Sequence, residues 1–253
     1  MTILAFAMQK GGVGKTTTTL AVGVELANLG KRVLLVDMDP QSNLTQALGV
    51  DPTALERSVH DVLLNPSQDL AAATLHTPHG VDLVPATLAL AAAELTLAGQ
   101  FGRELRLRTA LAASRRSYDY ILIDSPPSLG IFTINALTAA DAVIVPLQSH
   151  VFALQALPQL EETIAIVRQL NPSLAIGGIV VTMIDRRTSV NQMVEDAARQ
   201  QYGDLVFKTV VPFNVKLVEA PAAGMPIGVY APGSSGARAY HDLALEVAAR
   251  YGS

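Results

Sequence analysis

The sequence contains no cysteine among its 253 residues. A disulfide framework and a thiolate metal site are therefore excluded. Charge is also sparse, because Asp, Glu, Lys and Arg make up 16% of the chain and the formal net charge is −4. These values argue against a protein coated with basic surface for nucleic acid, so any contact with DNA must come from a local patch. The five histidines show no convincing spacing for a metal site: His60, His76, His79, His150 and His241.

Long hydrophobic runs are lacking as well. The most apolar later segment, residues 86–98, is interrupted by Glu94 and is well short of the roughly 20 residues that a membrane span needs. The apolar run at residues 3–8 is too short for the core of a signal peptide, and no basic segment precedes it. The sequence therefore predicts a cytoplasmic protein without a membrane partner.

The most informative motif directly follows the run at residues 3–8 and comprises Lys10, Gly11, Gly12, Val13, Gly14, Lys15, Thr16 and Thr17. A helix-like pattern starts near Thr16, so the order is strand, glycine loop and helix. The glycines let successive backbone N–H groups turn toward one anion, the helix N-terminus adds partial positive charge, and Lys15 adds a full one. The motif predicts a phosphate cradle in which the Thr16 hydroxyl is placed on Mg²⁺. The simpler interpretation is a glycine-rich turn with surface lysines.

Apolar, β-rich runs alternate with helix-period segments along the chain. This alternation predicts an α/β fold with a mostly parallel, twisted sheet covered by helices on both faces. Strands are predicted at residues 3–8, 32–37, 81–84, 118–124, 142–147, 176–183 and 206–211, and helices at residues 16–29, 87–97, 104–113, 152–170, 189–202 and 234–251. No repeat or long polar linker divides the sequence, so we expect one domain over residues 1–253, with the glycine loop at the carboxyl end of the first strand.

Two of the predicted strands end in carboxylates at the sheet edge that carries the loop. The second strand leads into Asp37 and Asp39, which share a face, and the strand at residues 118–124 ends in Asp124. An apolar strand that ends in Asp suits a Walker B carboxylate, which holds Mg²⁺ directly or through water. Taken alone, both patterns have simpler interpretations, because residues 37–43 are ordinary turn formers and apolar strands ending in Asp are common.

The loop departs from the usual pattern G-x-x-x-x-G-K-[ST], because Gln9 stands where the first glycine belongs and Lys10 is a second lysine. In these respects it resembles the deviant Walker A loop of the ParA/MinD ATPases, and most closely that of the ParA (Soj) branch. The resemblance covers residues 3 to about 251 and implies a P-loop NTPase fold, ATP and Mg²⁺ as cofactors, and slow ATP hydrolysis. The absence of cysteine separates the chain from the nitrogenase iron-protein and iron–sulfur scaffold branches, which bind their clusters through cysteine.

The resemblance also implies roles for single residues. Lys15 would bind phosphate, Asp39 would orient the attacking water, Asp124 would hold Mg²⁺, and Asp37 would support the Mg²⁺ shell. Lys10 would reach across a nucleotide-sandwich dimer to the phosphates of the partner, so that ATP closes a homodimer. Such a cation would offset the repulsion between two facing triphosphates. The alternative is that Lys10 is an ordinary surface lysine.

The segment at residues 211–217 resembles the family stretch I-P-R-N-V-R-L, which borders the adenine. The resemblance implies that Pro212 contacts the ring and Asn214 its edge, although Phe213 replaces the usual arginine. A strand-to-loop turn would explain Pro212 and Asn214 equally well.

Nonspecific binding to double-stranded DNA is a further implication of the resemblance. Arg187, in a segment similar to T-M-x-D-x-R-T, and Lys216 match positions that contact DNA in the family. One departure is that residues 231–237 resemble D-P-x-S-x-G-A without the arginine that many relatives add there. Without the resemblance, Arg186 and Arg187 read as a solvated loop. With it, we expect a weak patch per subunit that dimerisation doubles.

The implied partner is a ParB-type centromere-binding protein that stimulates hydrolysis by a nucleoid-associated ATPase. Because the sequence begins at the first strand, we expect the short form without an N-terminal helix-turn-helix. Three alternatives stay open: a ParA-like ATPase that positions another cargo, a MinD-like membrane ATPase, and an ATP-dependent biosynthetic ligase. The final helix pattern ends in residues 247–253 with one cation and no amphipathic tail, which disfavours the MinD alternative. Residues 37–43 together with Lys10 favour the switch over the ligase.

Overall fold

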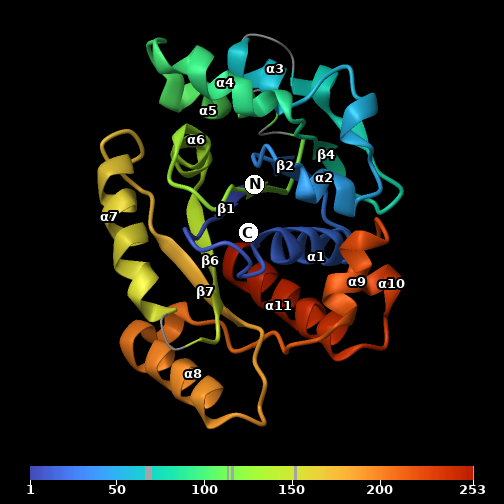
Figure 1. Ribbon diagram of the computed structural model, residues 1–253, viewed down its shortest axis with the longest axis vertical. Coiled ribbons are helices and arrows are strands. Elements are labelled where there is room, and N and C mark those ends of the chain that lie inside the picture. Colours follow the sequence, from blue (N-terminus) through green and yellow to red (C-terminus); the bar gives the residue numbers. More distant parts are fainter. Residues whose placement is uncertain (66–69, 113, 115–116, 151–152, 253) are drawn as a thin grey trace.

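The computed structural model describes residues 1–65, 70–112, 114, 117–150 and 153–252. Within these residues the chain forms a seven-stranded sheet with the order β3-β4-β2-β5-β1-β6-β7 (Figure 1). The strands are β1 (Thr2–Phe6), β2 (Val33–Asp37), β3 (Leu75–His76), β4 (Asp82–Val84), β5 (Tyr120–Asp124), β6 (Ala142–Gln148) and β7 (Ile176–Thr182). Neighbouring strands of this sheet are parallel except β3, which runs antiparallel to β4. The predicted α/β fold with a mostly parallel sheet is confirmed.

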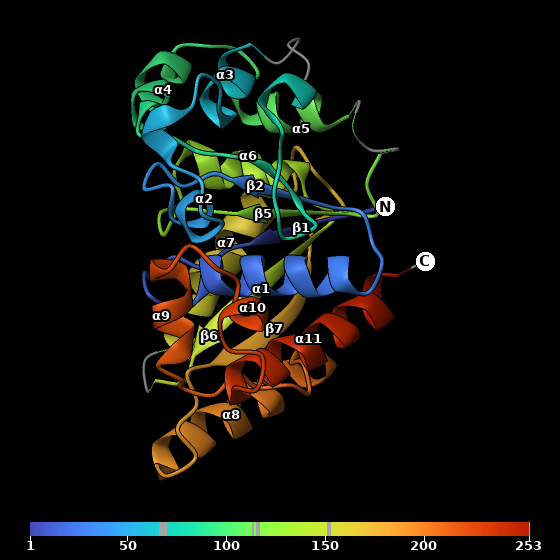
Figure 2. The ribbon, with the colours of Figure 1, turned by 90° about the vertical axis from the view of Figure 1, so that its right-hand side faces the viewer.

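Helices cover both faces of the sheet (Figures 1 and 2). One face is covered by α1 (Lys15–Asn28) and α11 (Ser235–Tyr251), and the other by α3 (Val59–Leu64), α4 (Ala89–Ala98), α5 (Arg106–Leu111), α6 (Ile131–Ala139) and α7 (Leu157–Val167). Side chains of β1 divide between two hydrophobic clusters, because Ile3 and Ala5 point into one and Leu4 and Phe6 into the other. Burial on both faces explains why these strands are apolar throughout rather than alternating.

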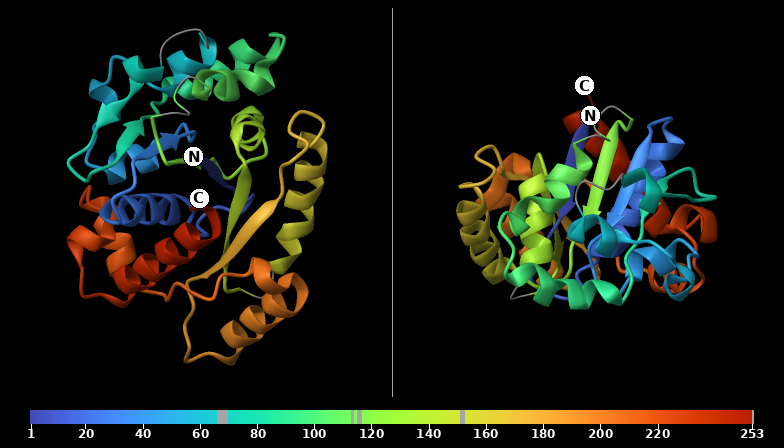
Figure 3. Two further views of the ribbon diagram at one scale, coloured as in Figure 1. Left: turned by 180° about the vertical axis from the view of Figure 1, so that it is seen from behind. Right: turned by 90° about the horizontal axis from the view of Figure 1, so that it is seen from above.

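Helices α3, α4 and α5 lie together at one end of the molecule, and α8 (Ser189–Tyr202) lies at the other (Figure 3). The remaining described helices are α2 (Asn43–Ala47), α9 (Lys216–Ala222) and α10 (Ile227–Tyr230), with 3₁₀ turns at Pro52–Ala54, Leu70–Ala73, Arg103–Leu105, Leu154–Ala156 and Gly203–Leu205. Strand β1 lies in the interior of the sheet between β5 and β6, and the glycine loop follows its carboxyl end.

Helices α2 and α9 approach each other through two glycines. Gly49 and Gly224 both have left-handed backbones, with φ of 76° and 66°. A Cβ atom added to Gly224 would lie 3.0 Å from the Cα atom of Gly49, and one added to Gly49 would lie 3.3 Å from the Gly224 carbonyl oxygen. The two backbones touch because neither residue has a side chain.

One predicted strand, at residues 206–211, is wrong. This segment runs beside β7 but makes only isolated bridges, between Val206 and Ile179 and between Pro212 and Ile184. Its Phe207 and Val211 nitrogens donate to β7 carbonyl oxygens at 2.9 Å. Between them the pairing is interrupted, because the Lys208 and Thr209 nitrogens donate to the Glu246 carboxylate at 2.8 and 2.7 Å. Sequence analysis also missed the short strand β3.

The long predicted helices are confirmed, with shifted ends. The helix predicted at residues 152–170 spans Leu157–Val167, and that predicted at residues 104–113 is a 3₁₀ turn followed by α5. Residues 113 and 152 lie outside the described residues. The missed helices are α2, α3, α6, α9 and α10. No helix among the described residues is long and apolar enough to cross a membrane.

Candidate functional site

The glycine loop joins the end of β1 to the start of α1, as the motif predicted. Gly12 and Gly14 have φ of 73° and 90°, a conformation that strains any residue with a Cβ atom. Gly14 is the N-cap of α1 and has no side chain to close the helix end. The N-terminal N–H groups of a long helix are therefore left for a ligand, which suits an anion.

Lys15 folds back over this loop. Its Nζ atom donates a hydrogen bond to the carbonyl oxygen of Lys10 at 3.2 Å, and the residue is only 7% exposed. Burial lowers the pKa of the Lys15 ammonium, while the charges of Asp124 and Asp39 act in the opposite direction. A nearly buried cation of this kind is stabilised by any anion that enters the loop.

Thr16 and Asp124 form the second part of the site. The Thr16 hydroxyl donates to Asp124 Oδ2 at 2.7 Å. The other oxygen, Oδ1, is buried and finds no hydrogen-bond partner among the described residues. Burial, and then repulsion from Asp37, raises the pKa of the Asp124 carboxyl well above its ordinary value. A buried carboxylate oxygen without a partner, next to a threonine hydroxyl, fits the oxygen ligands that Mg²⁺ requires.

Asp37 lies beside Asp124 in the register between β2 and β5. Its carboxylate is fully buried and accepts hydrogen bonds from the backbone nitrogen of Asp39 and from the backbone nitrogen and hydroxyl of Thr45. Burial raises the pKa of Asp37 to about 6, although these hydrogen bonds act against the rise. Both oxygens of Asp37 therefore already have protein partners.

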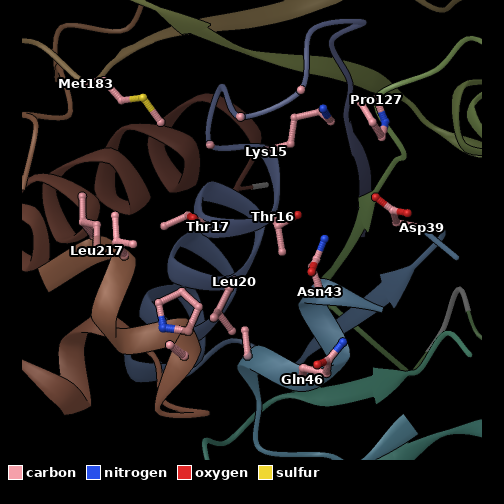
Figure 4. A pocket seen from close by; sticks show the side chains of 17 residues that line it. Lys15, Thr16, Thr17, Leu20, Asp39, Asn43, Gln46, Pro127, Met183 and Leu217 are labelled. Atoms are coloured by element: carbon pink, nitrogen blue, oxygen red, sulfur yellow. The ribbon is translucent and has the colours of Figure 1, made fainter. Parts of the chain in front are cut away.

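Asp39 faces a cavity of about 510 Å³ that the glycine loop also lines. Figure 4 shows Asp39 and Pro127 at one side of this cavity and Met183 and Leu217 at the other. Asp39 Oδ1 accepts a hydrogen bond from the Gln41 nitrogen at 2.9 Å. Across the described residues, no group of three His, Asp or Glu side chains gathers around a metal position. A cation held by Thr16 and Asp124 would thus need ligands from a bound molecule, as Mg²⁺ does when it binds with phosphates.

A small hollow of about 80 Å³ adjoins the loop at Gly14 and Thr17. Pro212 and Asn214 line it, and the contact of these residues with adenine stays a prediction. The Asn214 side chain is already used inside the protein, because Nδ2 donates to Ser235 Oγ at 2.9 Å and Oδ1 accepts from the Lys216 nitrogen at 2.9 Å.

Several residues that line these cavities were not identified from the sequence, namely Leu20, Gln46, Ala47, Met183, Val218, Pro221, Ala222 and Tyr240. Met183 has a left-handed φ of 57°, which is uncommon for a residue with a side chain. No sequence pattern signals this conformation.

Comparisons with known proteins decide the family. A family model described as an AAA domain matches residues 1–176. The sporulation initiation inhibitor protein Soj of Bacillus subtilis is 48% identical over 98% of both chains, and the chromosome partitioning protein ParA of Caulobacter vibrioides is 47% identical over 98% of this chain and 94% of its own. The chain belongs to the ParA/Soj family of partitioning ATPases. It is therefore an ATPase.

A solved structure is similar over nearly the whole chain. Cobyrinic acid a,c-diamide synthase from Mycobacterium smegmatis, with a bound ATP analogue and magnesium, is 40% identical and superposes with a TM-score of 0.86, covering 100% of this chain and 97% of that one. This likeness confirms the P-loop NTPase fold of the ParA/Soj member.

Lys10 is close to the site but does not line the large cavity. It is partly exposed, and its carbonyl oxygen accepts the hydrogen bond from Lys15. Among the described residues, its ammonium has no hydrogen-bond or ion-pair partner. The role that the ParA/Soj resemblance assigns to Lys10 stays a prediction.

The two expected DNA-contact residues lie in different settings. Arg187 forms a bidentate ion pair with Asp185, whose pKa these hydrogen bonds lower to about 2, and it lines a groove of about 570 Å³. Lys216 lies outside that groove, pairs with Glu219 at 2.7 Å and lies over the Tyr230 ring. That Arg187 and Lys216 form one DNA-contact patch stays a prediction.

Proposed function

We propose that this ParA/Soj-family ATPase is a nucleotide switch that partitions a chromosome or plasmid. In its ATP state it forms a homodimer and binds double-stranded DNA without sequence preference, and a ParB-type partner stimulates its hydrolysis. The observation that carries the proposal is that Lys15, Thr16 and Asp39 line one cavity in a chain 48% identical to Soj. The buried Asp124 lies directly behind them, hydrogen-bonded to Thr16.

ATP and Mg²⁺ are the cofactors that suit this site. The loop N–H groups and Lys15 bind the phosphates, and Thr16 and Asp124 hold Mg²⁺ with the charge of Asp37 supporting the shell. Bound Mg²⁺ supplies neutralisation of the charge that develops on the transferred phosphate. Asp39, which lies at the same cavity, orients the attacking water.

The adenine occupies the hollow at Pro212 and Asn214. This placement is supported by the continuity of the hollow with Gly14 and Thr17 of the loop, since one nucleotide must reach both. Pro212 would contact the adenine ring, and Asn214 keeps the edge of the hollow in place through its two hydrogen bonds.

Lys10 makes dimerisation depend on the third phosphate. Its ammonium has no partner within the described part of its own chain, so it is free to contact phosphates bound to the second subunit. When each subunit places its Lys10 ammonium on the phosphates bound to the other, the two cations offset the repulsion between the two triphosphates. ADP, which lacks the third phosphate, would not hold the dimer.

DNA binding is proposed to need the dimer, because each subunit alone offers little positive charge. Arg187 is exposed but paired with Asp185, and Lys216 is paired with Glu219. Two subunits double the number of phosphate contacts, and each contact adds to the salt dependence of binding. Association with the nucleoid follows from binding of this kind.

The proposal is tested by measuring the ATPase rate with and without nonspecific DNA, alongside sizing by light scattering in ATP and in ADP. We expect a dimer only in ATP, DNA binding only by that dimer, and weakening of this binding as salt rises. DNA binding that is equal in ATP and ADP, or that survives Arg187→Glu combined with Lys216→Glu, would contradict the assignment.

A biosynthetic ligase is the second candidate, because the solved structure with 40% identity is a cobyrinic acid a,c-diamide synthase. A ligase uses ATP to activate a carboxylate and has no reason to respond to DNA. Hydrolysis that DNA stimulates would exclude the ligase, whereas amidation of a cobyrinic acid substrate would establish it. A ParA-like ATPase for another cargo would give the same DNA response, and an adjacent ParB-type gene would separate it from partition.

A further inference from the structure

The loop between β2 and α2 carries Asp39, and one buried carboxylate holds both of its ends. Asp37 Oδ1 accepts a hydrogen bond from the Asp39 nitrogen at 3.0 Å. Asp37 Oδ2 accepts from the backbone nitrogen of Thr45 at 3.0 Å and from its hydroxyl at 2.7 Å. Because a buried carboxylate is costly without partners, these contacts draw the start and the end of the loop to one point.

The Thr45 hydroxyl makes one more contact. While it donates to Asp37, it accepts a hydrogen bond from the backbone nitrogen of Ala86 at 3.0 Å. Thr45 is fully buried, and Ala86 follows β4, the neighbour of β2 in the sheet. One hydroxyl therefore joins the end of β2, the helix α2 and the segment after β4, which requires a group that donates and accepts at once.

The loop held in this way is conformationally demanding. Ser42 has a left-handed φ of 57°. The Asp39 carboxylate accepts a hydrogen bond from the backbone nitrogen of Gln41, two residues further along the chain. A non-glycine residue in the left-handed region persists only where surrounding contacts fix it. The contacts to Asp37 and Ala86, together with the hydrogen bond from the Met38 nitrogen to the Asp124 carbonyl oxygen at 2.9 Å, fix both ends of this loop to the sheet.

We propose that Thr45 is a positioning residue for ATP hydrolysis, whose hydroxyl fixes the turn that presents Asp39 to the cavity. Thr45 does not line the cavity, so it acts through Asp39. The inference rests on the role proposed for Asp39 in orienting water. Thr45 would then be a functional residue that lies behind the cavity, where the ends of β2 and β4 meet.

The first test is Thr45→Val, which keeps the shape of the side chain and removes the hydroxyl. We expect the basal kcat for ATP to fall roughly tenfold or more, because the lost hydrogen bond is to a charged group and the turn loosens. The KM for ATP should stay unchanged, since the glycine loop, Lys15 and Thr16 are untouched. Thr45→Ser keeps the hydroxyl and should restore most of the turnover.

Thr138→Val is the matched control. Thr138 is a buried threonine on α6, and its hydroxyl has no hydrogen-bond partner among the described residues. We expect this variant to keep the kcat of the wild type. A loss equal to that of Thr45→Val would mean that any buried threonine matters equally, which would overturn the proposal.

Asp39→Ala separates this inference from the function on which it rests. If Asp39→Ala retains full turnover, the proposed role of Asp39 fails. If Asp39→Ala lowers turnover to a small measurable rate, and Thr45→Val leaves kcat intact or raises only KM, then the role of Thr45 alone fails. When both hold, adding Thr45→Val to Asp39→Ala should cause no further loss, because the two residues act as one unit.

Hydrogen exchange on the wild-type protein keeps the proposal testable if Thr45→Val does not fold. The backbone amides of Asp39, Thr45 and Ala86 should be protected together, because all three donate to one connected group. Free exchange of the Asp39 amide beside protected Thr45 and Ala86 would overturn the proposal.

Discussion

Replacing Gly224 with alanine should destabilise the protein through two separate effects. The backbone of Gly224 has φ of 66°, and a left-handed alanine costs about 1–2 kcal/mol. A Cβ atom there would also lie 3.0 Å from the Gly49 Cα atom and 3.4 Å from its nitrogen. Overpacking of this kind adds about 1–3 kcal/mol. We therefore expect the free energy of unfolding to fall by about 2–5 kcal/mol in Gly224→Ala.

Gly30→Ala is the control that isolates the contact. Gly30 has a similar backbone, with φ of 79°, but a Cβ atom added there would meet nothing within 4 Å. We expect this variant to lose only the backbone cost of about 1–2 kcal/mol. The difference between the two variants measures the contact between Gly224 and Gly49, which follow α9 and α2.

The measurement is urea unfolding followed by far-ultraviolet circular dichroism, since the sequence contains no tryptophan to report by fluorescence. The slope of the free energy against urea must stay equal among the variants, so that the midpoints report stability. Equal losses in Gly224→Ala and Gly30→Ala would refute the reasoning, because they would show that the backbones of Gly224 and Gly49 are not in contact.

Three further outcomes are expected. Lys10→Ala should bind nucleotide but remain monomeric in ATP by light scattering, and a normal ATP dimer would remove Lys10 from the interface. Asp124→Asn should raise the Mg²⁺ concentration for half-maximal turnover on the order of tenfold or more, because a charged oxygen ligand is lost; an unchanged Mg²⁺ requirement would contradict the metal site. Because burial raises the pKa of Asp37 from 3.8 to about 6, its stabilising contribution is complete below the lower value and is lost as pH rises through the upper one. The nucleotide-free protein should therefore lose on the order of 1 kcal/mol of unfolding free energy between about pH 5 and pH 7.5 from this group, measured by urea unfolding, and a gain in stability over that interval would count against the burial argument.

The sequence predicted those elements that depend on residues close together in the chain. Residues 10–17 need a strand before them and a helix after them, and both are visible as periodic patterns, so the cradle and its place in the fold followed. Strand-end carboxylates such as Asp124 followed for the same reason, because parallel strands end at one edge of the sheet. The resemblance to the ParA/Soj family then assigned roles that periodicity alone left open.

The missed features depend on partners that are distant along the chain. Residues 206–211 have the composition of a strand, but Glu246 accepts hydrogen bonds from two consecutive backbone N–H groups in the middle of this segment and interrupts its pairing with β7. The pairing of Lys216 with Glu219, and the left-handed backbone of Met183, likewise follow from tertiary structure and leave no periodic signal. Short helices such as α9, which contains Pro221, are also invisible to a search for helix periodicity.

The interior position of β1 has a consequence for how the nucleotide cycle works. Because β1 is hydrogen-bonded on both sides, its carboxyl end belongs to the part of the sheet that opens last, and the loop that grips phosphate is preorganised before any ligand arrives. Little ordering entropy then remains to be lost on binding. Differences between nucleotide states are consequently expected outside the glycine loop and the fixed Asp39 turn, for example in α9, whereas the grip itself stays constant throughout the cycle.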